Sequence, residues 1–115
     1  MQNYTRSIIV LIFLVSISCF SKASDDLDSL RKAIDLMPDD TNKVIKLKDL
    51  SYSYLKYQLD TSLFLSRRSV KLAQELNYKH GYASSLNQLG LVHKYKTEYD
   101  SALFYYKKSF EIFDE

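Results

Sequence analysis

Apolar side chains recur every three or four positions along most of this chain, which is the spacing of one face of an α-helix. The pattern predicts a short helix before Pro38 and four further helices after Thr41, joined by short connections. The residues that recur at this spacing along one face of each predicted helix are Leu27, Leu30, Ile34 and Met37; Val44, Leu47, Leu50 and Tyr54; Leu63, Phe64, Val70, Ala73 and Leu76, which are expected to point inward; Ala83, Leu86, Leu89, Gly90 and His93; and Ala102, Leu103, Tyr106, Phe110 and Phe113.

Polar and flexible residues predict where these helices begin and end. Ser24, followed by two aspartates, is expected to cap the helix that ends at Pro38. The segment 38–42 reads as a turn with a fresh cap, and Asp60 with Thr61 is expected to cap the third helix. The segment 77–81 predicts a loop with a permissive residue, Asn or Gly, at each end.

Composition supports an all-α chain of one domain. The 115 residues include only two glycines and one proline, too few for the turns of a many-stranded β fold. A chain of this length has no room for a second catalytic module. We therefore expect antiparallel helix hairpins, with residues 24–40 as a leading helix and turn.

The first 23 residues have the composition of an export signal. Arg6 precedes an uninterrupted apolar run over residues 8–15, which is shorter than the roughly 20 residues that cross a membrane. Small residues at Ser21 and Ala23 favour cleavage after Ala23. Lipidation at Cys19 and an uncleaved anchor are the alternatives. In each of these cases the protein leaves the cytoplasm, as a periplasmic or membrane-associated protein.

Cleavage after Ala23 changes the charge of the chain. The precursor has 16 basic and 14 acidic side chains, and loss of Arg6 and Lys22 leaves 14 of each. A neutral chain offers no electrostatic footprint for nucleic acid. Loss or lipidation of Cys19 also leaves no thiol for a disulfide or a metal.

The chain contains an internal repeat. Residues 60–72 (DTSLFLSRRSVKL) align with residues 100–112 (DSALFYYKKSFEI) at an offset of forty, with Asp, Leu, Phe and Ser recurring. The preceding segments, LKDLSYSY from Leu47 and LNQLGLVH from Leu86, align at thirty-nine. A one-residue difference in the connecting turn accounts for the two offsets.

These repeats resemble the tetratricopeptide repeat family over residues 41–115. His93 stands where Tyr is usual, and Ser51 and Ser62 take the small positions in the first repeat. The period near forty is similar to the long repeats of bacterial sensory and regulatory proteins. The resemblance implies a short α-solenoid of about two repeats; armadillo or HEAT-like hairpins are the alternative. The residues that match the family pattern and are expected to pack the repeat are Leu86, Leu89, Gly90, Ala102 and Tyr106, with His93 beside them.

The resemblance implies a protein–protein interaction module that binds a peptide or protein partner on its concave face, which the first helix of each hairpin lines. Tyr52 stands where the family needs Asn to clamp a C-terminal carboxylate, so that ligand is not expected. The residues expected on the concave face are Lys48, Tyr52, Leu55, Ser84, Asn87, Leu91 and Lys94.

The last predicted helix offers a second surface. About three repeats are normally needed for a stable stack, and two are visible here. Phe110 and Phe113 therefore stay uncovered at an open end, unless a second copy or a partner covers them. The alternative is that the chain is the N-terminal sensory part of a longer membrane-linked regulator of histidine kinase or DNA-binding type.

Little in the sequence indicates catalysis or a cofactor. Gly81 and Gly90 lie nine residues apart and form no phosphate loop. His80 is expected in a solvated loop and His93 in the core, neither with a second metal ligand at zinc-site spacing. The basic pairs at 67–68 and 107–108 are read as a solvated face, with an anionic partner as the alternative. We expect no enzyme, no cofactor, no metal and no nucleic acid for this segment.

Overall fold

The computed structural model describes the backbone of residues 2–114 and the side chains of residues 5–12 and 24–114. The chain divides into two compact units, one up to Lys32 and one from Ala33 onward. Each unit is described by itself.

Helix α1 (Gln2–Asp35) begins in the first unit and ends in the second. The predicted helix start at Ser24 is wrong, because the helix runs through this residue; no glycine or proline between Gln2 and Asp35 interrupts it. Among the described residues, no helix is both long and apolar enough to span a membrane. The export predictions for Cys19 and Ala23 lie outside the described side chains.

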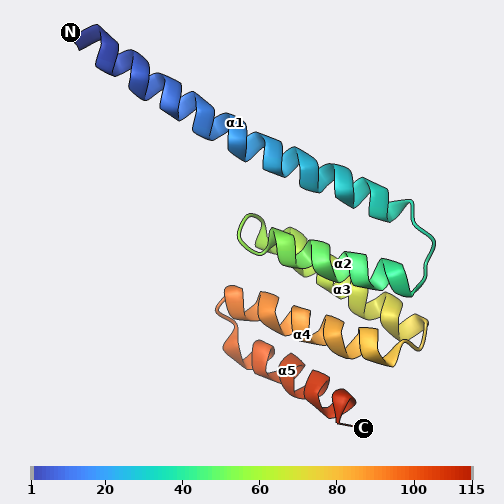
Figure 1. Ribbon diagram of the computed structural model, residues 1–115. Helices are drawn as coiled ribbons and strands as arrows, with labels where there is room; N and C mark the ends of the chain where they lie inside the picture. The colour runs from blue at the N-terminus through green and yellow to red at the C-terminus, as the bar shows by residue number, and fades with distance from the viewer. Residues whose placement is uncertain (1, 115) are drawn as a thin grey trace. The chain divides into compact units, whose positions relative to one another are not determined.

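The second unit is a stack of antiparallel helices (Figure 1). It contains α2 (Thr41–Tyr54), α3 (Leu59–Glu75), α4 (Lys79–Tyr95) and α5 (Tyr99–Phe113). Each helix packs against the next in the chain, and α2 also contacts α4. The all-α fold of stacked hairpins is therefore confirmed for the described residues.

The turn before α2 forms as predicted. Asp40 is the N-cap, and its carboxylate accepts a hydrogen bond from the Lys43 backbone N–H at 3.0 Å. The buried Lys43 Nζ donates to the Asp39 carboxylate at 2.8 Å and to the Met37 carbonyl at 3.1 Å. This hydrogen bond and the ammonium charge lower the pKa of Asp39.

Two other predicted boundaries differ from the structure. Helix α3 begins at Leu59 after Gln58, so Asp60 and Thr61 lie inside its first turn and do not cap it. Asn77 is in the left-handed region (φ 51°) that ends α3, as expected for the loop. Gly81 lies within α4, where a Cβ atom would overlap the Tyr78 ring; its small size serves packing and not a turn.

The core contains most of the predicted aliphatic residues, but the inner face of α3 is different. Phe64 and Leu76 point outward, with exposures of 51% and 36%, and that prediction is wrong. Three of the six buried positions of α3 are serines instead, whose small side chains permit the close approach of the helices on either side of it. The buried residues of α3 are Ser62, Leu65, Ser66, Ser69, Leu72 and Ala73.

The crossing of α4 and α5 is close at Gly90, as the repeat pattern predicts. A Cβ atom on Gly90 would lie 2.8 Å from Tyr106 Cδ1 and 3.2 Å from the Ala102 carbonyl oxygen. Gly90 and Ala102 are both buried, and Tyr106 is half-buried beside them. Leu86, Leu89 and His93 are buried on the same helix, which confirms the predicted packing face.

Ser51 and Ser62 take these places in the first hairpin. The Ser51 hydroxyl donates to the Ser62 carbonyl at 2.8 Å, and the Ser62 hydroxyl donates to the Ser51 carbonyl at 2.7 Å. Both residues are fully buried. Two small polar side chains therefore satisfy each other and permit the close crossing that glycine and alanine permit in the second hairpin.

A further hydrogen bond recurs at the same place in both hairpins. Ser69 donates to the Val44 carbonyl at 2.9 Å, and Ser109 donates to the Ala83 carbonyl at 2.6 Å. These serines are forty residues apart and their acceptors thirty-nine apart, which are the two offsets of the sequence repeat. The sequence repeat is therefore also a repeat of three-dimensional contacts.

Candidate groove between α2 and α4

The first helices of the two hairpins, α2 and α4, lie in contact and form a small groove between them. Its volume is about 210 Å³, below the 300–1,000 Å³ typical of pockets for drug-sized ligands. A groove of this size suits one or two side chains of a larger partner. It is lined by Lys48, Asp49 and Tyr52 from α2 and by Ser84, Asn87 and Gln88 from α4.

A buried hydrogen bond fixes the floor of the groove. Gln88 is 7% exposed, and its Nε2 donates to the Ser51 hydroxyl oxygen at 3.2 Å. Ser51 is itself held by Ser62, so the bond connects α4 to the crossing of the first hairpin. The groove is therefore supported by residues whose positions the core determines.

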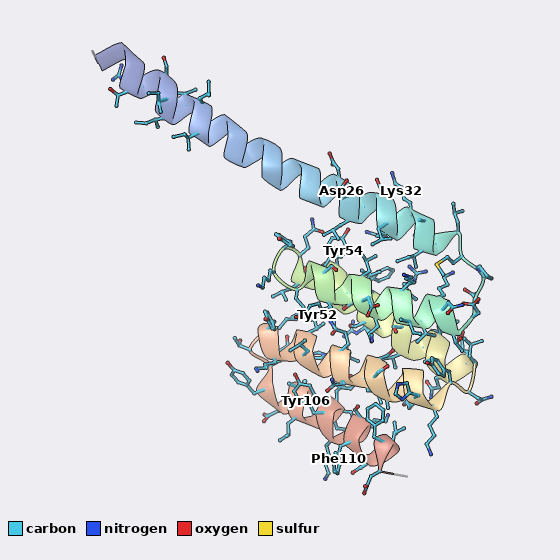
Figure 2. All side chains as sticks on the ribbon, in the orientation of Figure 1. Asp26, Lys32, Tyr52, Tyr54, Tyr106 and Phe110 are labelled. Carbon is cyan, nitrogen blue, oxygen red and sulfur yellow. The ribbon has the colours of Figure 1, made fainter. Side chains whose placement is uncertain are left out.

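The rim of the groove mixes charged, amide and aromatic groups. Lys48 Nζ lies 3.4 Å from the Asp49 carboxylate, which leaves the local charge balanced. Tyr52 is 64% exposed and is labelled in Figure 2, and Asn87 is also exposed. An exposed Asn side chain both donates and accepts, which matches the N–H and C=O groups of an extended peptide backbone.

The structure brings together four of the seven predicted concave-face residues: Lys48, Tyr52, Ser84 and Asn87. Leu91 is half-buried and Lys94 exposed, and neither lines this groove. Leu55 is only 4% exposed, so its assignment to a binding face is wrong. Its N–H bonds to the Tyr52 carbonyl three residues back, and this tighter turn at the helix end places Leu55 in the core.

Sequence reasoning missed Asp49 and Gln88. They occupy equivalent positions in the two repeats, thirty-nine residues apart, as do Lys48 and Asn87. The repeat alignment could therefore have identified all four as residues of one pseudo-symmetric surface. The helical period of three and four residues along a single face does not include Asp49 or Gln88.

A larger hollow of about 660 Å³ lies at the turn end of the hairpins. Its charged partners are loosely held, since Lys96 Nζ is 3.8 Å from the fully exposed Asp60 carboxylate. An open surface of this kind has no buried polar group that would orient a ligand. The hollow is lined by Gln58, Leu59, Asp60, Thr61, Tyr95 and Lys96.

The predicted basic pairs do not form one patch. They lie on α3 and α5, which are separated by α4 in the stack (Figure 1). Arg68 pairs with Asp35 at 2.7 Å and lies over the Phe64 ring, and Lys108 lies over the Tyr82 ring. These contacts fit solvated faces of two separate helices better than a single anion-binding stripe.

The two histidines occupy different environments. His93 is buried, stacks on Tyr105 and shares a 2.8 Å hydrogen bond with Glu98 through Nδ1. This bond lowers the pKa of the Glu98 carboxyl. His80 is exposed, but it lies in the first turn of α4 and not in the predicted loop, and it makes an edge contact with Phe113. Across the described residues, no cluster of three His, Cys, Asp or Glu side chains is placed to hold a metal ion.

The outer face of α5 is apolar and exposed, as predicted for Phe110 and Phe113, whose exposures are 68% and 52%. Tyr99 and Leu103 continue the same face at steps of three and four residues, with exposures of 65% and 67%. Tyr106 lies in the middle of this face, where partial burial raises its pKa.

No family model, curated protein or solved structure matches the chain.

Proposed function

We propose that this chain is an exported protein–protein interaction module, whose groove between α2 and α4 receives an extended peptide segment of a partner. The observation that carries the proposal is the groove itself. Two helices of separate hairpins contribute an exposed aromatic ring, an exposed amide and a lysine around a floor fixed by the bond between Gln88 and Ser51.

The chemistry of the groove favours a peptide with an apolar or aromatic side chain. Such a side chain stacks on the exposed ring of Tyr52 and displaces water from both surfaces. The Asn87 amide pairs with one backbone amide of the same segment. With Lys48 paired to Asp49, the groove carries no net charge that would require a charged ligand. The proposal assigns the site to binding, not to catalysis.

Export is part of the same proposal. It is supported by the apolar run over residues 8–15 behind Arg6 and by the small residues before Ser24. Mass spectrometry of the protein recovered from producing bacteria tests it. We expect a mature N-terminus at Ser24. An acylated Cys19 would identify a lipoprotein that is still exported, and an intact N-terminus in the cytoplasmic fraction would contradict export.

Selection of the full chain against a displayed library of short linear peptides tests the groove. Tyr52→Ser and Asn87→Ala should each raise the dissociation constant of the selected peptides by about tenfold, the cost of one good interface contact. Tyr95→Ser is the matched control, because Tyr95 is also exposed but lines the larger hollow. The proposal would be contradicted if peptide binding were lost in Tyr95→Ser but kept in Tyr52→Ser. It would also be contradicted if no library peptide bound the chain.

A further inference from the structure

Helix α5 presents an apolar stripe that its counterpart in the first hairpin does not expose. The stripe consists of Tyr99, Leu103, Tyr106, Phe110 and Phe113, at steps of four and three residues along one side of the helix. In Figure 2, Tyr106 and Phe110 are labelled on this helix. Apart from the half-buried Tyr106, each of these side chains is between 52% and 68% exposed.

The first hairpin shows how this fold treats the same face. Forty residues earlier, α3 carries Leu59, Leu63, Ser66, Val70 and Ala73 at the equivalent positions. Helix α4 packs on α3, with the Ser85 and Ser69 hydroxyls 2.6 Å apart. In α5, the serine, valine and alanine are replaced by tyrosine and two phenylalanines. The uncovered copy of the face is therefore larger and more apolar than the covered copy.

An uncovered helix face in this chain does not have to be apolar, because an exposed face of α2 carries polar side chains. Four positions of α2, which correspond at an offset of thirty-nine to Ser85 and its neighbours on one side of α4, are all polar and exposed. They are Asn42, Lys46, Asp49 and Ser53. These four positions of α2 are thus compatible with water, whereas the stripe of α5 exposes large apolar side chains.

We infer that the stripe of α5 is the interface of a two-fold symmetric dimer, in which α5 of one copy packs antiparallel to α5 of a second copy. If copies stacked head to tail, the apolar stripe of one copy would contact the polar side of α2 of the next copy. A symmetric pairing instead joins two apolar stripes, and it closes after two copies.

Charge complementarity selects the register of this pairing. Asp100 and Lys107 are exposed and flank the stripe on the side away from α4. When Leu103 lies opposite Tyr106 of the second copy and Tyr99 opposite Phe110, each Asp100 faces a Lys107 across the two-fold axis. The neighbouring register, with Tyr106 opposite Phe110, brings the two Lys107 side chains together. The first register is therefore favoured.

The available area predicts a reversible dimer. A whole aromatic side chain buries about 150–250 Å², so the four most exposed stripe residues offer roughly 400–600 Å² per copy. A standard stable interface buries about 800 Å² per partner. The self-association should therefore depend on protein concentration.

Sedimentation of the full chain over a concentration series tests the surface. Phe110→Ser should raise the dimer dissociation constant at least about tenfold. Phe104→Ser is the matched control: Phe104 is 59% exposed on the same helix but lies off the stripe, so its dimer should persist. Equal loss in both variants, an unchanged dimer in Phe110→Ser, or a wild-type chain that stays monomeric up to about millimolar concentration would overturn the inference.

Charge reversal tests the register. Asp100→Lys and Lys107→Asp should each weaken the dimer by about threefold to tenfold, since two symmetric pairs become repulsive. The double variant should return to within about twofold of the wild type. Failure to recover, with helix content unchanged by circular dichroism, would overturn the two-fold pairing. Both dimer tests measure the molar mass of the assembly and not peptide binding, so their outcome is independent of the test of the groove.

Discussion

The two hairpins solve the same packing problem with different chemistry. Where α2 crosses α3, Ser51 and Ser62 exchange hydrogen bonds with each other's carbonyl groups. Where α4 crosses α5, Gly90 and Ala102 have no side-chain polar group to satisfy, and Tyr106 packs over the glycine. Both crossings require small side chains. A polar side chain is tolerated at such a buried crossing only because the residue opposite forms hydrogen bonds with it.

The turns differ as well. In the first hairpin the Gln58 N–H bonds to the Tyr54 carbonyl, four residues back. In the second, the Glu98 N–H bonds to the His93 carbonyl, five residues back, and Thr97 adopts φ 62°. This extra residue is the reason that the repeat offset changes from thirty-nine to forty. It also places an acidic side chain beside His93, where the first hairpin has the neutral pair of Tyr54 and Gln58.

The largest effect is expected from filling the crossing of the second hairpin. Gly90→Val places methyl groups against Tyr106 and the Ala102 carbonyl, which already lie within 3.2 Å of a single Cβ atom. We expect a loss of about 3 kcal/mol in the free energy of unfolding, at the upper end for overpacking. Urea unfolding followed by circular dichroism measures it.

Lys94→Val is the control for this substitution. Lys94 is exposed on the same helix, so the helix propensity changes while the crossing does not. A loss below about 1 kcal/mol in Gly90→Val would mean that α5 moves away at little cost. The two crossings would then not be equivalent in tightness.

A matched pair of serine substitutions sharpens the comparison at intermediate size. Ser69 donates its hydroxyl hydrogen to Val44, so Ser85 must donate to Ser69. Ser69→Ala therefore strands a buried donor and should cost about 1–3 kcal/mol. Ser109→Ala removes the hydrogen bond to the Ala83 carbonyl, and this loss should cost about 0.5–1.5 kcal/mol in the free energy of unfolding.

Urea unfolding of both serine variants under the same conditions gives the comparison. The ordering is the test, because both substitutions remove one hydroxyl from a buried helix face. A Ser109→Ala variant that is less stable than Ser69→Ala would show that the contact with Ser85 contributes little.

The sequence was sufficient for those parts of the fold that depend on local spacing. The apolar period located α2 to α5, and the repeat alignment identified Ser51 and Ser62 as the counterparts of Gly90 and Ala102. The inner face of α3 could not be read in this way. Its serines look like surface residues until their partners on the neighbouring helices are known, and Phe64 looks like core.

The groove was predictable only in part for a related reason. Periodicity gives the direction of a side chain along a straight helix, and it found Lys48, Tyr52, Ser84 and Asn87. It failed at Leu55, where the helix tightens, and at Gln88, whose side chain reaches Ser51 across the contact between α2 and α4. Both depend on geometry that a single helical period does not contain.

The smallest effect concerns acid sensitivity at the turn of the second hairpin. The hydrogen bond from His93 lowers the pKa of Glu98 in the folded chain below its unfolded value of about 4.3. The stability from this contact is therefore fully present above that value, and it is lost as the pH falls through the lowered folded pKa. Gln58 stands at the equivalent place in the first hairpin and does not titrate.

Glu98→Gln should remove this contribution, so the difference in unfolding free energy between wild type and variant should shrink as the pH falls from 7 to about 3. His93→Phe retains a ring against Tyr105 but removes the hydrogen bond. In that variant, the Glu98 pKa measured by NMR titration should rise toward its ordinary value. A Glu98 pKa that stays low without His93 would assign the shift to Lys96, whose Nζ lies 3.7 Å from the same carboxylate.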